Sequence, residues 1–107
     1  MKRGDLVTVA FAGDFGKPRP ALIVQSDVFE HIASVTVLPL TSNLTELRRT
    51  RIIVMPTPEN GLRNPSGIMI DKIGTLPRVK VGPVFGRLSA DEINAVNRAL
   101  AIFLGIV

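Results

Sequence analysis

Short stretches of β-branched and aliphatic residues recur before residue 89, and this pattern predicts a mainly β fold. Residues 5–11 alternate apolar and small polar side chains, as in a strand with one buried face. Residues 21–24 form the unbroken apolar run Ala-Leu-Ile-Val, which predicts a strand over 19–26 that is buried on both faces. We therefore expect short strands over residues 5–11, 19–26, 34–41, 50–55, 68–73 and 82–88.

Apolar residues recur at the spacing of an α-helix only after residue 89. Ser89 and Glu92 have the spacing of a capping box, in which the serine oxygen accepts the glutamate amide. Apolar residues then recur every three or four positions as far as Gly105, where a helix is expected to end. Many short strands followed by one helix favour a small barrel with a C-terminal α-helix. Residues 99–107 carry no charged side chain, which predicts that this surface packs on the barrel or is covered by a partner such as a second copy.

Proline and glycine mark the connections. Pro39 lacks an N–H, which predicts that the strand over 34–41 lies at an edge or bends before its end. Residues 56–67 hold three prolines, two glycines and two asparagines, and we interpret them as a plain connector. Residues 27–33 are expected to form a short connection with at most one helical turn, and 74–81 a corner between strands.

The composition limits the class of protein. A chain of 107 residues predicts one domain, 1–107, with an aliphatic core, because its five aromatic residues are all phenylalanine. The absence of cysteine excludes disulfides, thiol catalysis and zinc–thiolate sites, and it suits the reducing cytoplasm. No run of eighteen apolar residues and no apolar signal core is present, so we expect neither membrane insertion nor export.

The charge is strongly basic, with a formal net charge of +4 and a pI near 10.4, which favours a polyanionic partner or an acidic protein. The basic residues gather in three groups that loops at one end of a barrel could bring together. These groups are Lys17 with Arg19, Arg48 with Arg49 and Arg51, and Arg78 with Lys80 and Arg87.

Arg19 stands where a glycine and proline loop meets the apolar strand after Pro20. Glycine leaves the loop backbone flexible, whereas the prolines fix φ near −65°, so the backbone becomes rigid where the strand begins. A guanidinium held there near solvent suits a fixed cationic site for phosphate. The alternative is a surface arginine that ends a strand and pairs with a carboxylate.

The chain resembles, almost end to end, the MazF/PemK family of bacterial toxin–antitoxin toxins, also called Kid-like toxins. The resemblance is carried by Arg3-Gly4-Asp5, residues 16–24 (Gly-Lys-Pro-Arg-Pro-Ala-Leu-Ile-Val), Pro39-Leu40-Thr41-Ser42, residues 67–73 and Gly86-Arg87-Leu88-Ser89. It implies an SH3-like barrel of the CcdB/MazF type, a homodimer, and a ribosome-independent endoribonuclease that cuts single-stranded messenger RNA at short sequences. It also implies an acidic, disordered MazE-like antitoxin that covers the RNA groove.

The same resemblance places the essential arginine of the family at Arg19 and its essential threonine at Thr41. Two departures stand beside this match. Many members carry His-Glu in the first loop, where this chain has Gly13-Asp14. The Kid branch carries Arg-x-Asp on the fifth strand, where Met69-Ile70-Asp71 keeps only the aspartate.

Metal-free RNA cleavage needs a base for the 2′-OH, a group that carries phosphorane charge, and an acid for the leaving oxygen. Arg19 suits the charged phosphorane and Thr41 a phosphate oxygen, whereas the base is either Asp14 or Asp71. The single histidine, His31, is remote in sequence from this loop and is left out. The carboxylates lack the spacing of a metal site, so no metal or cofactor is expected. The further RNA contacts predicted are Lys17, Phe15 and Ser42.

Two other functions remain open at this point. Val24-Gln25-Ser26-Asp27 and Leu104-Gly105-Ile106 resemble the gyrase poison CcdB, although Leu104 stands in place of its C-terminal tryptophan. The third possibility is an SH3-like adaptor that binds an acidic protein without catalysis. Single-stranded RNA and supercoiled DNA with gyrase, incubated separately with the protein, distinguish the three.

Overall fold

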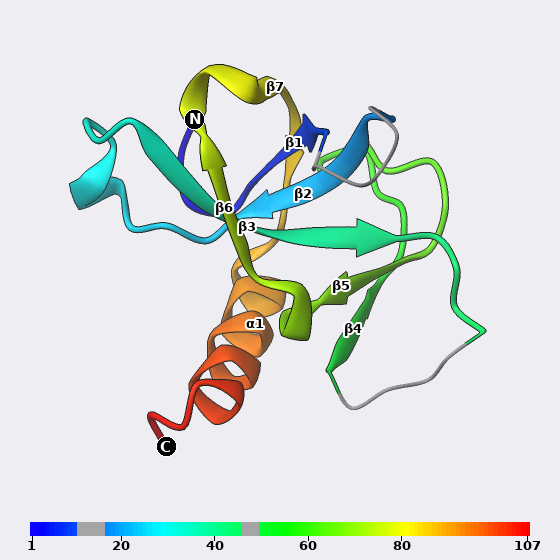
Figure 1. Ribbon diagram of the computed structural model, residues 1–107. Helices are drawn as coiled ribbons and strands as arrows, with labels where there is room; N and C mark the ends of the chain where they lie inside the picture. Colours follow the sequence, from blue (N-terminus) through cyan, green and yellow to red (C-terminus); the bar gives the residue numbers. More distant parts are fainter. Residues whose placement is uncertain (11–16, 46–49) are drawn as a thin grey trace.

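The computed structural model describes residues 1–10, 17–45 and 50–107 (Figure 1). Within them lie seven strands, three short 3₁₀ turns and one α-helix. In chain order these are β1 (Asp5–Val9), β2 (Arg19–Ile23), η1 (Asp27–Phe29), β3 (Ser34–Thr41), β4 (Arg51–Val54), β5 (Ser66–Met69), η2 (Ile70–Lys72), β6 (Gly74–Pro77), η3 (Arg78–Lys80), β7 (Val81–Arg87) and α1 (Ala90–Phe103).

All the strand pairs are antiparallel, in the order β4-β5-β3-β2-β1-β7, and β6 pairs with β3 outside this path. The mainly β fold with one C-terminal helix is therefore confirmed. In the described part of the chain no ladder joins β4 to β7, so strand pairing does not close a barrel.

β3 is the strand that joins the two halves of the sheet. One of its edges pairs with β6 over residues 34–37 and then with β5 over 40–41. Pro39 lies where the neighbour changes, so its missing N–H falls in the gap between two ladders. The other edge pairs with β2, which means that β3 is an interior strand, and the prediction of an edge position was wrong.

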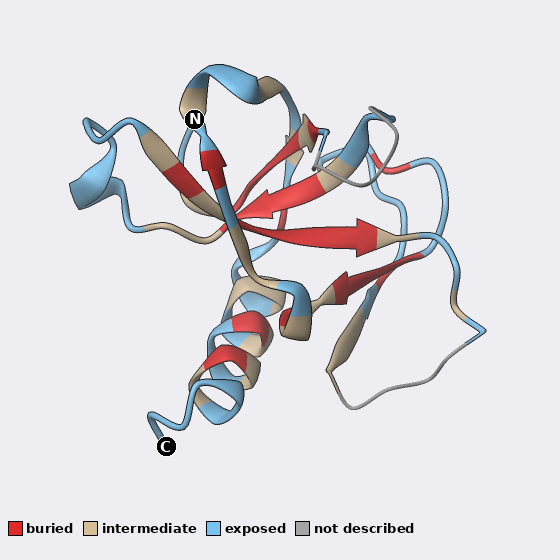
Figure 2. Ribbon diagram, viewed as in Figure 1, coloured by how far each residue is buried: buried red, intermediate tan, exposed pale blue. Residues whose placement is uncertain are grey.

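Hydrophobic cores lie on both faces of the sheet, as the apolar run at 21–24 predicted. Figure 2 shows that buried residues make up much of β2 and β3. Leu22 contributes to a core that includes Val96 and Leu100 of α1. Its neighbours Ala21 and Ile23 contribute to a second core. Alternate residues of β2 therefore stabilise opposite faces, which fixes the backbone at the start of the strand, Arg19.

Several predicted boundaries were wrong. The strand expected over 68–73 ends at Met69 and gives way to η2, whereas the corner expected over 74–81 contains β6 and η3. β6 has only one buried side chain, Leu76, and its strand structure comes from pairing with β3 rather than from its own sequence. The second strand ends at Ile23 instead of residue 26. Phe11, expected to end the first strand, lies outside the described residues.

The helical predictions are confirmed. The Ser89 hydroxyl accepts the Glu92 amide at 3.2 Å, and the Glu92 carboxylate accepts the Ser89 amide at 2.9 Å. Gly105 follows the helix with φ of +73°, a conformation that glycine adopts without strain. The end of the chain leaves large apolar side chains exposed, namely Ile102, Phe103, Leu104, Ile106 and Val107.

Candidate functional site

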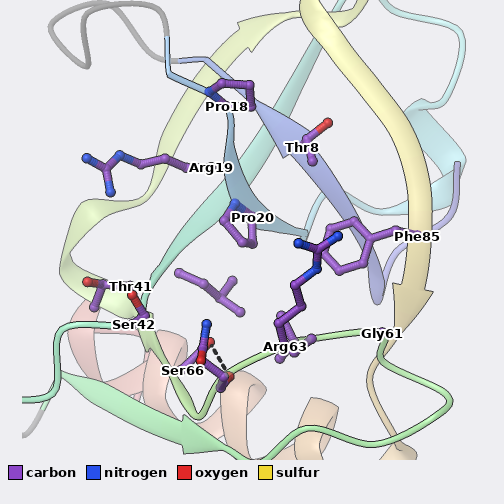
Figure 3. Close-up of a pocket in the computed structure, with 13 residues that line it drawn as sticks. Thr8, Pro18, Arg19, Pro20, Thr41, Ser42, Gly61, Arg63, Ser66 and Phe85 are labelled. Atoms are coloured by element: carbon purple, nitrogen blue, oxygen red, sulfur yellow. Dashed lines mark hydrogen bonds between the residues drawn. The ribbon is translucent and has the colours of Figure 1, made fainter.

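A cleft of about 610 Å³ opens along one end of the sheet (Figure 3). Its walls come from β1, β2, the end of β3, β7 and the connector that joins β4 to β5, residues 55–65. The residues that line it are Thr8, Pro18, Arg19, Pro20, Leu40, Thr41, Ser42, Gly61, Leu62, Arg63, Asn64, Ser66 and Phe85.

Arg19 and Thr41, predicted from widely separated parts of the sequence, both line this cleft. β2 and β3 are antiparallel, and their last pair at this end is Ala21 with Pro39, so Arg19 and Thr41 each lie two residues beyond that pair, at the same end of the two strands. Arg19 is the exposed first residue of a strand whose next residues are buried, so its backbone is fixed while its guanidinium reaches solvent. The structure therefore brings the predicted cation and hydroxyl together.

The hydroxyl side of the cleft consists of Thr41 and Ser42 (Figure 3). Thr41 is half-buried, and its hydroxyl oxygen accepts the amide of Asn43 at 3.1 Å. This bond uses a lone pair of the oxygen and leaves the O–H available as a donor. Ser42 is exposed. The pair can donate hydrogen bonds to a phosphate bound beside Arg19.

The other predicted contact residues lie at the margin of the cleft or beyond the described residues. Lys17 is exposed and immediately precedes the lining residue Pro18, without lining the cleft itself. Asp14 and Phe15, as well as Arg48 and Arg49, lie outside the described residues.

Asp71 is not among the residues that line the cleft. It belongs to η2, and its carboxylate is bonded to the Arg51 guanidinium. Burial raises the pKa of Asp71, but hydrogen bonds from Arg51 and Thr50 and the charge of Arg51 together hold it below the ordinary 3.8. A carboxylate held ionised by an arginine is a weak proton acceptor, so this placement does not favour Asp71 as a general base.

Several of the basic residues that the sequence grouped together have structural roles. Arg78 donates to the carbonyls of Phe29, Ile32 and Ser34, and Arg87 pairs with the buried Asp5 at 3.0 Å. These arginines fix chain segments to one another. His31 is exposed and does not line the cleft.

The interpretation of residues 56–67 as a plain connector was wrong, because five of them line the cleft. Arg63 is the only charged residue among these five, and it belonged to none of the three basic groups identified in the sequence. The signal that could have found it is local: Arg63 is enclosed between Asn60-Gly61 and Asn64-Pro65, two strong turn dipeptides. An arginine placed between two turns is held in position much as Arg19 is.

The described residues contain no group of three or more side chains suited to hold a metal ion. Likewise, no described helix has the length and apolar character needed to cross a membrane.

Residues 2–104 match the family of the PemK-like, MazF-like toxins of type II toxin–antitoxin systems. The chain belongs to this family. A MazF-family protein of Mycolicibacterium smegmatis, described as a probable endoribonuclease MazF, is 47% identical over 107 residues, covering 99% of this chain and 98% of its own. The endoribonuclease MazF3 of Mycobacterium tuberculosis is 34% identical over 85 residues, covering 78% of this chain and 80% of its own.

Two solved structures share the fold. The Mycobacterium tuberculosis toxin MazF-mt6 superposes with a TM-score of 0.80 at 28% identity, covering 94% of this chain and 96% of its own. A mycobacterial endoribonuclease solved with its cognate antitoxin has a TM-score of 0.83 at 24% identity, covering 100% and 97% of the two chains. The MazF/PemK resemblance drawn from the motifs is thus confirmed.

Proposed function

We propose that this MazF-family protein is the toxin of a type II toxin–antitoxin system, a sequence-specific endoribonuclease that cleaves single-stranded messenger RNA without a metal ion. The observation that carries the proposal is the cleft that Arg19 and Thr41 both line. The full-length similarity to a probable endoribonuclease MazF supports the same reaction class.

The reaction is an attack of the ribose 2′-OH on the adjacent phosphorus, with cleavage of the bond to the 5′ oxygen. The products are a 2′,3′-cyclic phosphate and a 5′-OH: the base takes the 2′-OH proton, and the leaving 5′ oxygen receives a proton from Arg19. Arg19 donates two parallel hydrogen bonds to the phosphorane oxygens, where negative charge accumulates in the transition state. Thr41 donates to a phosphate oxygen and fixes the reacting group. Asp14 remains the candidate base, because Asp71 is held by Arg51.

The strands form an SH3-like barrel of the CcdB/MazF type, and the exposed apolar end of α1 belongs to a homodimer interface. The net charge of +4 suits both RNA and an acidic MazE-like antitoxin that covers the cleft. The protein acts in the cytoplasm, where its messenger RNA substrate is.

The test uses purified protein and a long single-stranded RNA, first in buffer with EDTA. We expect fragments with 5′-OH ends, and loss of cleavage on chelation would contradict the metal-free reaction. Arg19→Ala should lower kcat by about a hundredfold or more, which is the effect of removing one oxyanion donor. Turnover close to wild type in that variant would exclude Arg19 from the reaction. Intact RNA together with gyrase-dependent linearisation of plasmid DNA would instead support a gyrase poison.

A further inference from the structure

We propose that Arg63 and Phe85 form a binding site for a nucleotide that flanks the scissile phosphate. In this site the phenylalanine ring stacks on the base, and the guanidinium binds the phosphate of that nucleotide. The inference rests on the proposed RNA-cleaving function and extends it from the reacting bond to the neighbouring residue of the substrate.

The first observation is that the connector is held in one shape by a buried side chain. Asn60 is only 1% exposed. Its side-chain oxygen accepts the amides of Thr57 and Leu62, both at 3.0 Å, and its side-chain nitrogen donates to the Met55 carbonyl at 2.9 Å. All three bonds lie within the connector, so Arg63 follows a segment with a fixed backbone.

The second observation is that the connector is fastened to β7 at the position of Phe85. A Cβ added to Gly61 would lie 2.6 Å from the Phe85 carbonyl oxygen and 3.2 Å from its ring. A Cβ on Gly86 would lie 2.1 Å from the Asn60 carbonyl oxygen. Only glycine allows backbones to approach this closely, so the two cleft walls that carry Arg63 and Phe85 are held against each other.

The third observation is that Arg63 has no structural task. Among the residues that the structure describes, Arg63 makes no ion pair and no side-chain hydrogen bond, whereas Arg51, Arg78 and Arg87 each have partners. Arg63 is exposed and lines the cleft. A guanidinium presented by a rigid segment without a protein partner suits an anionic ligand.

The fourth observation is the layout of the cleft. Figure 3 shows Arg19 and Thr41 on one side of Pro20, and Arg63 extending toward Phe85 on the other. Phe85 is 36% exposed, so part of its ring is open to a base. Base–aromatic stacking tolerates any base, and it is a common means of binding single-stranded nucleic acid. The cleft thus offers a cation and a hydroxyl at the reacting phosphate, then a second cation and a ring for the adjoining nucleotide.

The experiment uses an RNA oligonucleotide that carries the cleavage site mapped on the long RNA. Cleavage rates are measured for the full-length protein and for Arg63→Ala, Arg63→Lys and Phe85→Leu over a range of salt concentrations. The matched control is Arg98→Ala, which removes an equal charge from an exposed position on α1. Direct binding to a 2′-O-methyl version of the oligonucleotide, which cannot react, gives a second readout.

We expect Arg63→Ala and Phe85→Leu to raise KM by about tenfold, with kcat within about twofold of wild type, because neither side chain touches the reacting atoms. Arg63→Ala should also lower the slope of log KM against log salt concentration by about 0.7, the value for one phosphate contact on a single strand. Arg63→Lys should keep that slope. Arg98→Ala should behave as wild type.

Unchanged KM and unchanged binding in both Arg63→Ala and Phe85→Leu would overturn the nucleotide site, even if Arg19→Ala still abolished cleavage. An effect of Arg63→Ala no larger than that of Arg98→Ala would do the same, since it would reflect net charge alone. If the wild-type protein cleaved no RNA, the proposed function would fail separately. In that case a 2′-O-methyl oligonucleotide of arbitrary sequence is used, and its equal binding by wild type and Arg63→Ala would refute the site itself.

Discussion

Asn60→Ala should destabilise the protein by about 2–6 kcal/mol, an estimate that follows from the three hydrogen bonds of the side chain. The Leu62 amide is buried, and losing its acceptor costs about 1–3 kcal/mol. Thr57 and Met55 are exposed, so water can partly replace the bonds to them, and each loss costs about 0.5–1.5 kcal/mol. A loss of this size is a large part of the roughly 5–15 kcal/mol that stabilises a domain.

The assay is urea unfolding at a single protein concentration, because any self-association contributes to the measured stability. Asn94→Ala, at an exposed position on α1, is the control and should change the unfolding free energy by less than about 0.5 kcal/mol. A loss of under about 1 kcal/mol in Asn60→Ala, with an unchanged slope against urea, would refute the idea that this side chain fixes the connector.

Substitutions of Asp71 and Ser89 should change the unfolding free energy. The pKa of Asp71 is lower in the folded protein than its ordinary 3.8, so its stabilising contribution is present above the unfolded pKa and is lost as the pH falls through the folded one. Asp71→Asn should therefore lose less unfolding free energy than wild type between pH 5 and pH 3, and an equal loss would argue against the Arg51 pair as the cause. Ser89→Ala should cost about 1 kcal/mol by removing the oxygen that accepts the Glu92 amide, whereas Ser89→Asp should keep most of that stability in the same urea assay.

The sequence predicted those elements of the fold whose residue pattern lies within a single segment of the chain. The apolar run at 21–24 and the capping box at Ser89 act through neighbouring residues, and the structure confirms both. β6 was missed because Gly-Thr-Leu-Pro has the composition of a turn and becomes a strand only beside β3. Pro39 predicted an edge or a bend, and the sequence could not distinguish these because it does not reveal that one strand changes partners along its length.

The candidate site was predictable only in part. Arg19 and Thr41 could be proposed together because a family resemblance joined them, and the register of β2 with β3 gives the physical reason. Arg63 was missed because its placement depends on the fastening of the connector to β7, a contact between segments far apart in the chain. Conversely, Arg87 looked like one more free basic residue, yet it neutralises the buried Asp5.

The pairing of β1 with β7 bears on when the protein becomes harmful to the cell that makes it. The cleft needs Thr8 from β1 and Phe85 from β7, and β1 finds its second neighbour only after residue 87 has been made. A ribosome must therefore release the chain as far as residue 87 before the cleft exists. We expect an unfinished toxin to spare the message that encodes it.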